Sequence, residues 1–122
     1  MAAPLTIAER QVGSCSVLQL SGKLVAEDTR VCADAVDELI DRGAVDLVIN
    51  LSGVSTLDSG GVGVLVSKYL RARRAGGDLK LVCLSGHACR VLAVAGLLKI
   101  FEAFESEDAA AGSFHGVTAK ST

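Results

Sequence analysis

Residues 44–67 read AVDLVINLSGVSTLDSGGVGVLVS, and this stretch decides the fold. Its first part, residues 44–51, is a nearly continuous apolar run rich in valine and isoleucine, which is typical of a strand covered on both faces. From Val62 onwards, apolar residues recur three or four positions apart, which predicts a helix that ends at Gly76 and Gly77. A buried strand followed by a loop and a helix is the repeating unit of a parallel α/β sheet.

The flanking sequence extends this unit in both directions. Apolar periodicity bounded by glycines predicts strands at residues 6–10, 17–21, 79–84 and 100–104, and helices at residues 31–40, at 88–95 and from 106. The predicted order is β-β-α-β-α-β-α-β-α, so the fold class is α/β: a small mixed, mainly parallel β-sheet with helices packed on it. We expect residues 1–112 to form a single domain and residues 113–122 to be a flexible C-terminal tail.

Composition limits the possible functions. The chain has 122 residues, half of them apolar, and a net charge of −2, which gives no basic field for a direct nucleic-acid partner. The beginning of the chain resembles neither a signal peptide nor a transit peptide, and the longest apolar run, residues 91–98, is too short to span a bilayer. We therefore expect a cytoplasmic protein that needs no membrane.

The four cysteines, Cys15, Cys32, Cys83 and Cys89, include no C-x-x-C pair. Each lies in an apolar pattern where a small buried side chain would serve. The main interpretation is therefore a set of core thiols without a metal or cofactor, and a metal or redox site is the alternative.

The second half of the opening stretch raises a question of chemistry. If Asp58 caps the helix, then Ser59, Gly60 and Gly61 are its first residues, and two glycines there cost about 1 kcal/mol each relative to alanine in a helix interior. One interpretation is that the glycines let the chain turn and pack. The other is that they let a second molecule approach the backbone and the Ser59 hydroxyl.

Three kinds of chemistry could use such a turn at the carboxyl end of a strand. A nucleophilic serine needs a base, and the only histidines are His87 and His115, so we do not expect an enzyme. A phosphate-binding loop would need a complete G-x-G-x-x-G or G-K-[ST] pattern, which leaves a nucleotide-binding module as a weak alternative. In the third, Ser59 is itself phosphorylated and gains about 1.5 to 2 negative charges next to Asp58.

Two longer segments resemble the STAS domain of bacterial anti-sigma factor antagonists. They are LSGKLVAEDTRVCADAVDELIDRG, residues 20–43, and residues 46–106, in which LSGVSTLDSGGVGVL and VLAVAGLLKIF are the most specific parts. The fold of that family, a small mixed sheet with helices packed on it, agrees with the predicted order.

The resemblance implies a partner-switching protein. In that family the unphosphorylated antagonist binds an anti-sigma factor with serine kinase activity and so frees the sigma factor. The kinase phosphorylates the serine that follows the aspartate of the loop, and a metal-dependent serine phosphatase reverses the modification. The matching serine is Ser59, Asp58 matches the preceding acid, and Gly61 and Gly63 match glycines of the family.

The residues around Ser59 complete the predicted partner-binding site, which comprises Asp58, Gly60, Gly61, Gly63, Val54, Thr56 and Leu57. Val54 and Leu57 either pack under the loop or form an exposed contact patch. Ser55 and Thr56 are weaker candidates for modification. Three positions differ from the family pattern: Gly60 replaces a frequent Ser or Thr, and Val25 and Asn50 each replace a frequent Asp.

Two further functions remain as alternatives to the switch. One is a STAS subunit of a larger assembly, such as a stressosome-like scaffold or a lipid-transport complex, whose binding does not depend on Ser59. The other is the nucleotide-binding module.

Overall fold

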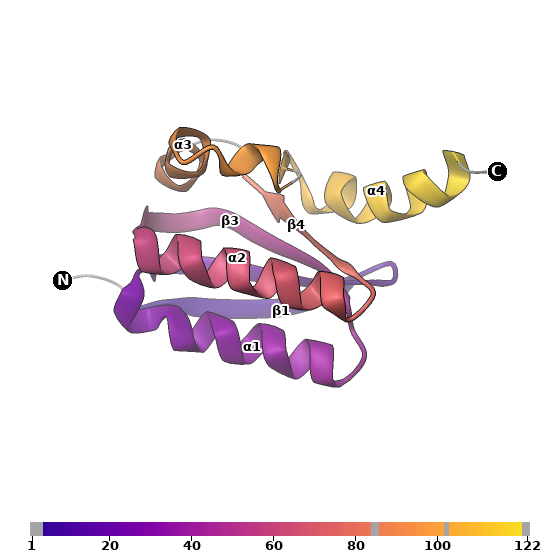
Figure 1. The fold of residues 1–122 in the computed structure, drawn as a ribbon, viewed down its shortest axis with the longest axis horizontal. Helices are drawn as coiled ribbons and strands as arrows, with labels where there is room; N and C mark the ends of the chain where they lie inside the picture. Colours follow the sequence, from indigo (N-terminus) through magenta and orange to yellow (C-terminus); the bar gives the residue numbers. More distant parts are fainter. Residues whose placement is uncertain (1–3, 84–85, 102, 121–122) are drawn as a thin grey trace.

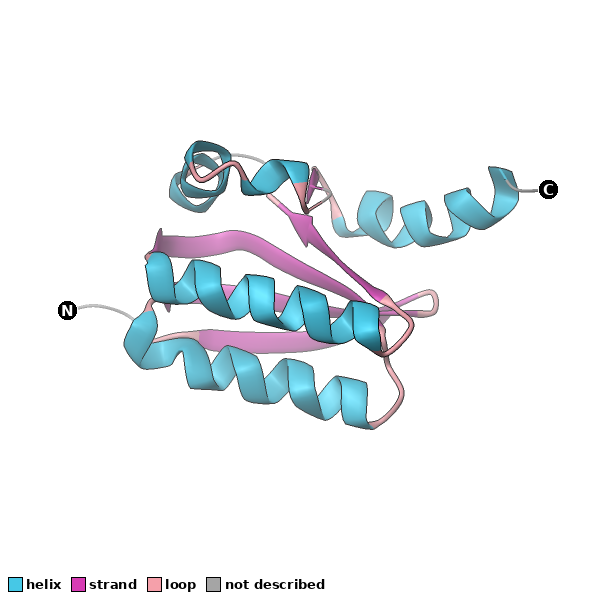
Figure 2. Ribbon diagram, in the orientation of Figure 1, coloured by secondary structure: helices cyan, strands magenta, loops and turns pink. Residues whose placement is uncertain are grey.

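The computed structural model describes residues 4–83, 86–101 and 103–120, which form one five-stranded sheet with helices on both of its faces (Figures 1 and 2). The strands are β1 (Thr6–Val12), β2 (Cys15–Leu24), β3 (Asp46–Leu57), β4 (Asp78–Val82) and β5 (Ala103–Phe104). They lie in the order β1-β2-β3-β4-β5. The β1–β2 pair is antiparallel and the other three pairs are parallel, which confirms the predicted mixed sheet.

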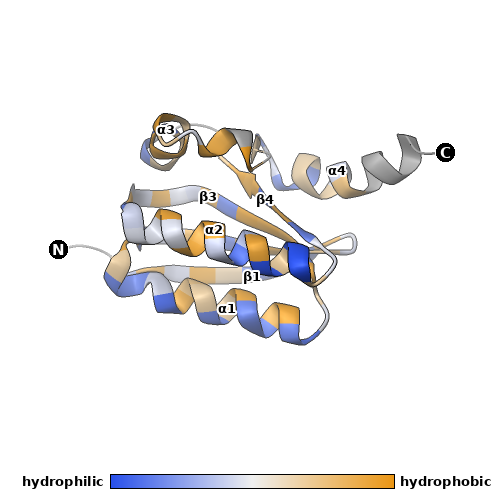
Figure 3. Ribbon diagram, in the orientation of Figure 1, coloured by the Kyte–Doolittle hydropathy of each residue, from blue (hydrophilic) through white to orange (hydrophobic). Residues whose placement is uncertain are grey.

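The helices follow the predicted alternation with the strands. They are α1 (Thr29–Asp41), α2 (Ser59–Arg74), α3 (His87–Val94) and α4 (Glu107–Lys120), with short 3-10 turns η1 (Ala26–Asp28) and η2 (Leu97–Lys99). α1 and α2 lie side by side across one face of the sheet, and α3 packs against β3 (Figure 1). Hydrophobic and hydrophilic residues alternate along α1 and α2, as amphipathic helices on a sheet require (Figure 3).

The sheet has two apolar faces of unequal size. Leu47 and Ile49 of β3 join the main core beneath α1, α2 and α3, which also contains the fully buried Leu65. Val48, between them, points to the other face and packs with Ala110 and Ala111 of α4. This alternation explains why β3 reads as a continuous apolar run.

The main departure from the predicted elements is the length of β3. We predicted that the strand ends at residue 51 and that a loop follows, but β3 continues to Leu57 because it stays paired with β2, from Ser21↔Gly53 to Leu24↔Leu57. Two register shifts interrupt this pairing. Such irregularities bend a strand, and local sequence patterns do not reveal them.

The C-terminal elements also differ in length from the prediction. β5 has only two residues, because the chain before it still closes the η2 turn: the N–H groups of Ile100 and Phe101 both donate to the Leu97 carbonyl oxygen, so the strand predicted at residues 100–104 forms only at its end. α4 starts where Ser106 was predicted to cap it, with the Ser106 hydroxyl accepting a hydrogen bond from the Ala109 N–H at 3.1 Å, but the helix passes residue 112 and reaches Lys120. Ser113 and Phe114 of this helix both contact Lys80 of β4. The single domain over residues 1–112 and the flexible tail over residues 113–122 remain predictions.

Candidate functional site

The start of α2 is fixed by the carboxylate of Asp58. One carboxylate oxygen accepts a hydrogen bond from the Gly61 N–H at 2.9 Å, as predicted for an N-cap residue, and the other accepts one from the Ala26 N–H of η1 at 3.1 Å. These bonds, first that of Gly61 and then that of Ala26, lower the pKa of Asp58 below its ordinary value. Asp58 therefore ties α2 to the segment between β2 and α1.

Ser59 lies at the first position of α2, and its side chain is exposed. Within the described part of the chain, the Ser59 hydroxyl has no hydrogen-bond partner. The two weaker candidates differ from it: the Ser55 hydroxyl donates to the Gly22 carbonyl at 3.2 Å, and Thr56 is half-buried. Of the three hydroxyls, that of Ser59 is the most available to another molecule.

The three glycines of the site have two different roles. A Cβ at Gly61 would lie 2.2 Å from the Leu24 carbonyl oxygen, and one at Gly60 would lie 2.7 Å from Cα of Ala26. Neither distance is possible for a real side chain, so these two glycines allow the chain to pack on itself. A Cβ at Gly63 would meet nothing within 4 Å, so Gly63 alone leaves open space beside the helix for another molecule.

Val54 and Leu57 belong to the core. Val54 is 6% exposed and Leu57 is 3% exposed, so the idea that they form an exposed contact patch is wrong. Their position follows from the extension of β3 and from its irregular pairing, because the register shift between the Gly22↔Val54 and Lys23↔Thr56 pairs lets two residues three positions apart face the same core. They pack in the core beneath the start of α2, where Leu57 lies against Gly61.

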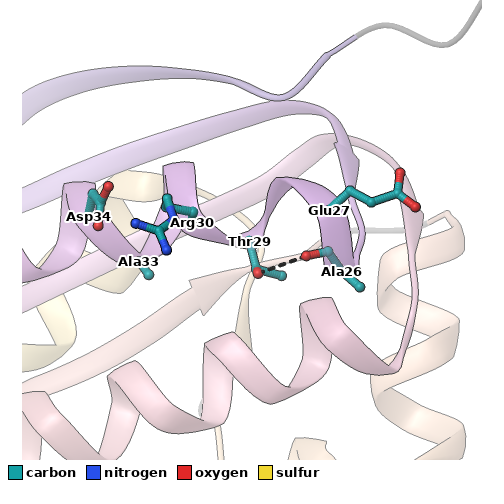
Figure 4. Close-up of a pocket in the computed structure, with 6 residues that line it drawn as sticks. All are labelled: Ala26, Glu27, Thr29, Arg30, Ala33 and Asp34. Carbon is teal, nitrogen blue, oxygen red and sulfur yellow. Dashed lines mark hydrogen bonds between the residues drawn. The ribbon is translucent and has the colours of Figure 1, made fainter.

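The segment that precedes α1 completes the site, although the predicted site residues include none of it. Ala26 donates to Asp58 and lies against Gly60, while the Leu24 carbonyl lies against Gly61. An open hollow beside it, along the start of α1, is lined by Ala26, Glu27, Thr29, Arg30, Ala33 and Asp34 (Figure 4). The sequence gives little indication of this role, because a backbone N–H donor and a small side chain such as those of Ala26 form no recognisable motif.

Asn50 lies outside this site, under the start of α4. Its side-chain amide donates to Glu107 at 2.8 Å, and its side-chain oxygen accepts from the Ser52 N–H at 2.9 Å. The guanidinium of Arg10 also binds Glu107, with a distance of 2.7 Å from Nε. The Arg10 bond first, and then the Asn50 bond, lower the pKa of Glu107 below its ordinary value. The asparagine that distinguishes this chain from the family pattern therefore fastens α4 to the sheet.

The cysteines occupy three separate places. Cys15 and Cys32 are fully buried on opposite faces of the sheet, whereas Cys83 and the half-buried Cys89 lie close together between β4 and α3. In the part of the chain that the structure describes, no three His, Cys, Asp or Glu side chains gather as metal ligands would.

The chain belongs to the STAS family, because the model of the STAS domain matches residues 6–110. An anti-sigma-B factor antagonist of Bacillus subtilis (strain 168) is 33% identical over 85 residues, which cover 70% of this chain and 77% of the relative. An anti-sigma F factor antagonist of Paenibacillus polymyxa is 27% identical over 92 residues, which cover 75% and 79% of the two chains. Its curated relatives are thus anti-sigma factor antagonists.

Solved structures agree with this assignment of the fold. An anti-sigma factor antagonist from Mycobacterium paratuberculosis superimposes with a TM-score of 0.82 at 24% identity, over 93% of this chain and 97% of the other. The Bacillus cell fate determinant SpoIIAA in its phosphorylated form gives a TM-score of 0.66 at 22% identity, over 85% and 96%. Among the described residues, no helix is both long enough and apolar enough to cross a membrane.

Proposed function

We propose that this protein is a regulatory anti-sigma factor antagonist, without enzymatic activity of its own, whose binding is switched at Ser59. The unphosphorylated form binds an anti-sigma factor with serine kinase activity and frees a sigma factor. Phosphorylation of Ser59 ends that binding, and a metal-dependent serine phosphatase restores it. The observation that carries the proposal is the exposed, unpartnered hydroxyl of Ser59 beside a carboxylate whose two oxygens already hold backbone N–H groups.

The arrangement explains how one phosphate could act without unfolding the domain. At the start of α2 the helix dipole and the free N–H groups favour negative charge, so the fold tolerates the phosphate. A partner that contacts Ser59 and Gly63 closely would meet the phosphate and the Asp58 carboxylate together. A loss of about 3 to 4 kcal/mol of binding free energy would weaken the complex roughly 100- to 1000-fold.

The relatives support this function in two ways. The curated relatives are named anti-sigma factor antagonists, and SpoIIAA, which shares the fold, has been solved in a phosphorylated form. Gly63, which matches a glycine of the family, is exposed with open space around its Cα, as a contact with a partner would require.

The first test is phosphorylation in vitro. Each anti-sigma factor kinase encoded in the same cells is incubated with this protein and Mg·ATP, and the products are analysed by intact and fragment mass. We expect a gain of about 80 Da, one phosphate, on the wild-type chain and on Ser55→Ala, and no gain on Ser59→Ala. Phosphate on Ser59→Ala, or on no form of the protein with any of the kinases, would contradict the proposal.

The second test measures binding to the same kinase by calorimetry. Ser59→Ala should bind as the wild-type chain does, and Ser59→Asp should bind at least 100-fold more weakly. Tight and equal binding by all three forms would instead indicate a subunit of a constitutive assembly, in which Ser59 is not a switch.

A further inference from the structure

Two thiols lie next to each other where the chain passes from β4 to α3. Cys83 follows the last residue of β4, and Cys89 is the third residue of α3. The Cys89 thiol donates a hydrogen bond to the Cys83 carbonyl oxygen, with a sulfur-to-oxygen distance of 3.3 Å. Gly86, which precedes α3, has a φ of 98°, a left-handed conformation that favours glycine.

The geometry places the two residues next to each other. A disulfide needs Cα atoms within about 7 Å and Cβ atoms about 4 Å apart. The Cys89 sulfur lies 3.3 Å from the Cys83 carbonyl oxygen, so the two residues are direct neighbours, as a disulfide requires. Burial first, and then the neighbouring Cys89 thiol, raise the pKa of Cys83 to about 12.

We propose that Cys83 and Cys89 form a reversible disulfide when the protein meets a hydroperoxide. Cys89 is the half-exposed member of the pair, so its sulfur is the one that a peroxide can reach. The Cys89 thiol first loses its proton, and the thiolate attacks one oxygen of hydrogen peroxide. The O–O bond breaks, Cys89 becomes a sulfenic acid, and the leaving hydroxide takes up a proton to form one water.

The second step closes the bond. The sulfur of Cys83 attacks the sulfur of Cys89, the S–O bond breaks, and the leaving hydroxyl takes the Cys83 proton to form a second water. In total, two thiols are oxidised and one hydrogen peroxide is reduced to two waters. The high pKa of Cys83 makes its thiolate scarce, but its position beside the sulfenic sulfur compensates through proximity.

The remaining cysteines cannot form a competing pair in the folded chain. Cys15 and Cys32 are both fully buried, on opposite faces of the sheet. Both are 0% exposed, whereas Cys89 is partly exposed, so access to the peroxide distinguishes these two thiols from the pair. The structure thus distinguishes one reactive pair from two inert thiols, which the spacing of the cysteines along the sequence could not do.

The test is peroxide oxidation of the folded, full-length protein, followed by blocking of free thiols with N-ethylmaleimide, intact-mass analysis and peptide mapping. The probe is hydrogen peroxide itself. Cys89→Ser is the test variant, and Cys15→Ala is the matched control because it removes a buried thiol and leaves the pair. Circular dichroism before and after treatment confirms that each form stays folded.

Counted without the maleimide groups, the oxidised wild-type chain and Cys15→Ala should be about 2 Da lighter than their unoxidised forms, dithiothreitol should restore this mass, and the disulfide should map to Cys83 and Cys89. Cys89→Ser should show no such loss. Oxygen addition without a disulfide in the wild-type chain, a bond that involves Cys15 or Cys32, or a cross-link between two molecules would each overturn the proposal. Because the readout does not involve Ser59 or any partner, it is independent of the proposed function.

Discussion

Two acidic side chains tie helices to the sheet, and they do so in opposite ways. Asp58 at the start of α2 accepts hydrogen bonds from two backbone N–H groups, those of Gly61 and Ala26. Glu107, in the first turn of α4, binds two side chains, those of Arg10 and Asn50. The Asp58 bonds hold the backbone in place and leave the adjacent Ser59 exposed, whereas the Glu107 bonds connect α4 to the sheet.

The difference shows how the start of a helix can be held tightly and still leave a serine exposed. At the Asp58 end, Gly60 and Gly61 have no side chains, so the backbone of α2 packs directly against the segment that follows β2. At the Glu107 end, longer side chains fill the space, and Glu107 is only 14% exposed. Ser106, beside Glu107, is exposed as well, but its hydroxyl already accepts a hydrogen bond from the Ala109 N–H, whereas the Ser59 hydroxyl has no partner among the described residues.

The largest expected effect comes from breaking the backbone contact at the Asp58 end. Gly61→Ala would place a Cβ 2.2 Å from the Leu24 carbonyl oxygen and 2.6 Å from Cδ1 of Leu57, so the chain must move. We expect the free energy of unfolding in urea to fall by about 3 kcal/mol. A loss below about 0.5 kcal/mol would mean that the two segments are not tightly packed.

Breaking the side-chain tie at the other end should have the next largest effect. Glu107→Ala leaves Arg10 and the buried Asn50 without their shared acceptor, and we expect a loss of about 2 kcal/mol, with faster hydrogen exchange confined to α4. Asp108→Ala is the matched control, because Asp108 has the same charge, is the next residue of the helix and is exposed. Equal losses for the two variants would show that the tie contributes nothing specific.

Removal of the cap of α2 should cost less, because the Asp58 bonds are partly open to water. We expect Asp58→Ala to lower the free energy of unfolding by about 1 kcal/mol. Asp58→Asn keeps one side-chain oxygen for the Gly61 N–H but turns its NH2 group, a donor, towards the Ala26 N–H, so about half of that loss should remain. The comparison in urea separates the cap of α2 from the bond to Ala26, and a larger loss for the asparagine variant than for the alanine variant would contradict the cap.

Gly63→Ala should separate stability from binding. Nothing lies within 4 Å of the added Cβ, so the substitution should raise the free energy of unfolding by roughly 0.5–1 kcal/mol through better helix propensity. If a partner approaches this position closely, binding to the anti-sigma factor kinase should weaken in the same variant. A more stable variant with unchanged binding would place Gly63 outside the contact.

The smallest effect is a change in the pH dependence of stability. The pKa values of Asp58 and Glu107 are both lowered in the folded chain from ordinary values of 3.8 and 4.5. Each group therefore contributes stability above its ordinary pKa, and that contribution is lost as the pH falls through its lowered value. The free energy of unfolding, measured in urea between pH 6 and 2, should fall less steeply with decreasing pH for Asp58→Asn and Glu107→Gln than for the wild-type chain.

The sequence by itself determined the class of the fold and the position of the site. Apolar periodicity and the glycines between the elements predicted the order of strands and helices, because these patterns reflect local geometry. The helix start at Ser59 and the cap at Asp58 also followed, since an N-cap depends on residues three positions apart. Resemblance supplied the family, which the match over residues 6–110 confirms.

Only the tertiary structure decided what each residue of the site does. The sequence could not show that Gly61 serves packing while Gly63 is open, because the difference depends on Leu24 and Ala26, more than thirty residues away. Val54 and Leu57 are buried because pairing with β2 extends β3, and Asn50 gains its role from a carboxylate 57 positions later. Contacts between residues distant in the chain are set by packing, which leaves no local pattern to read.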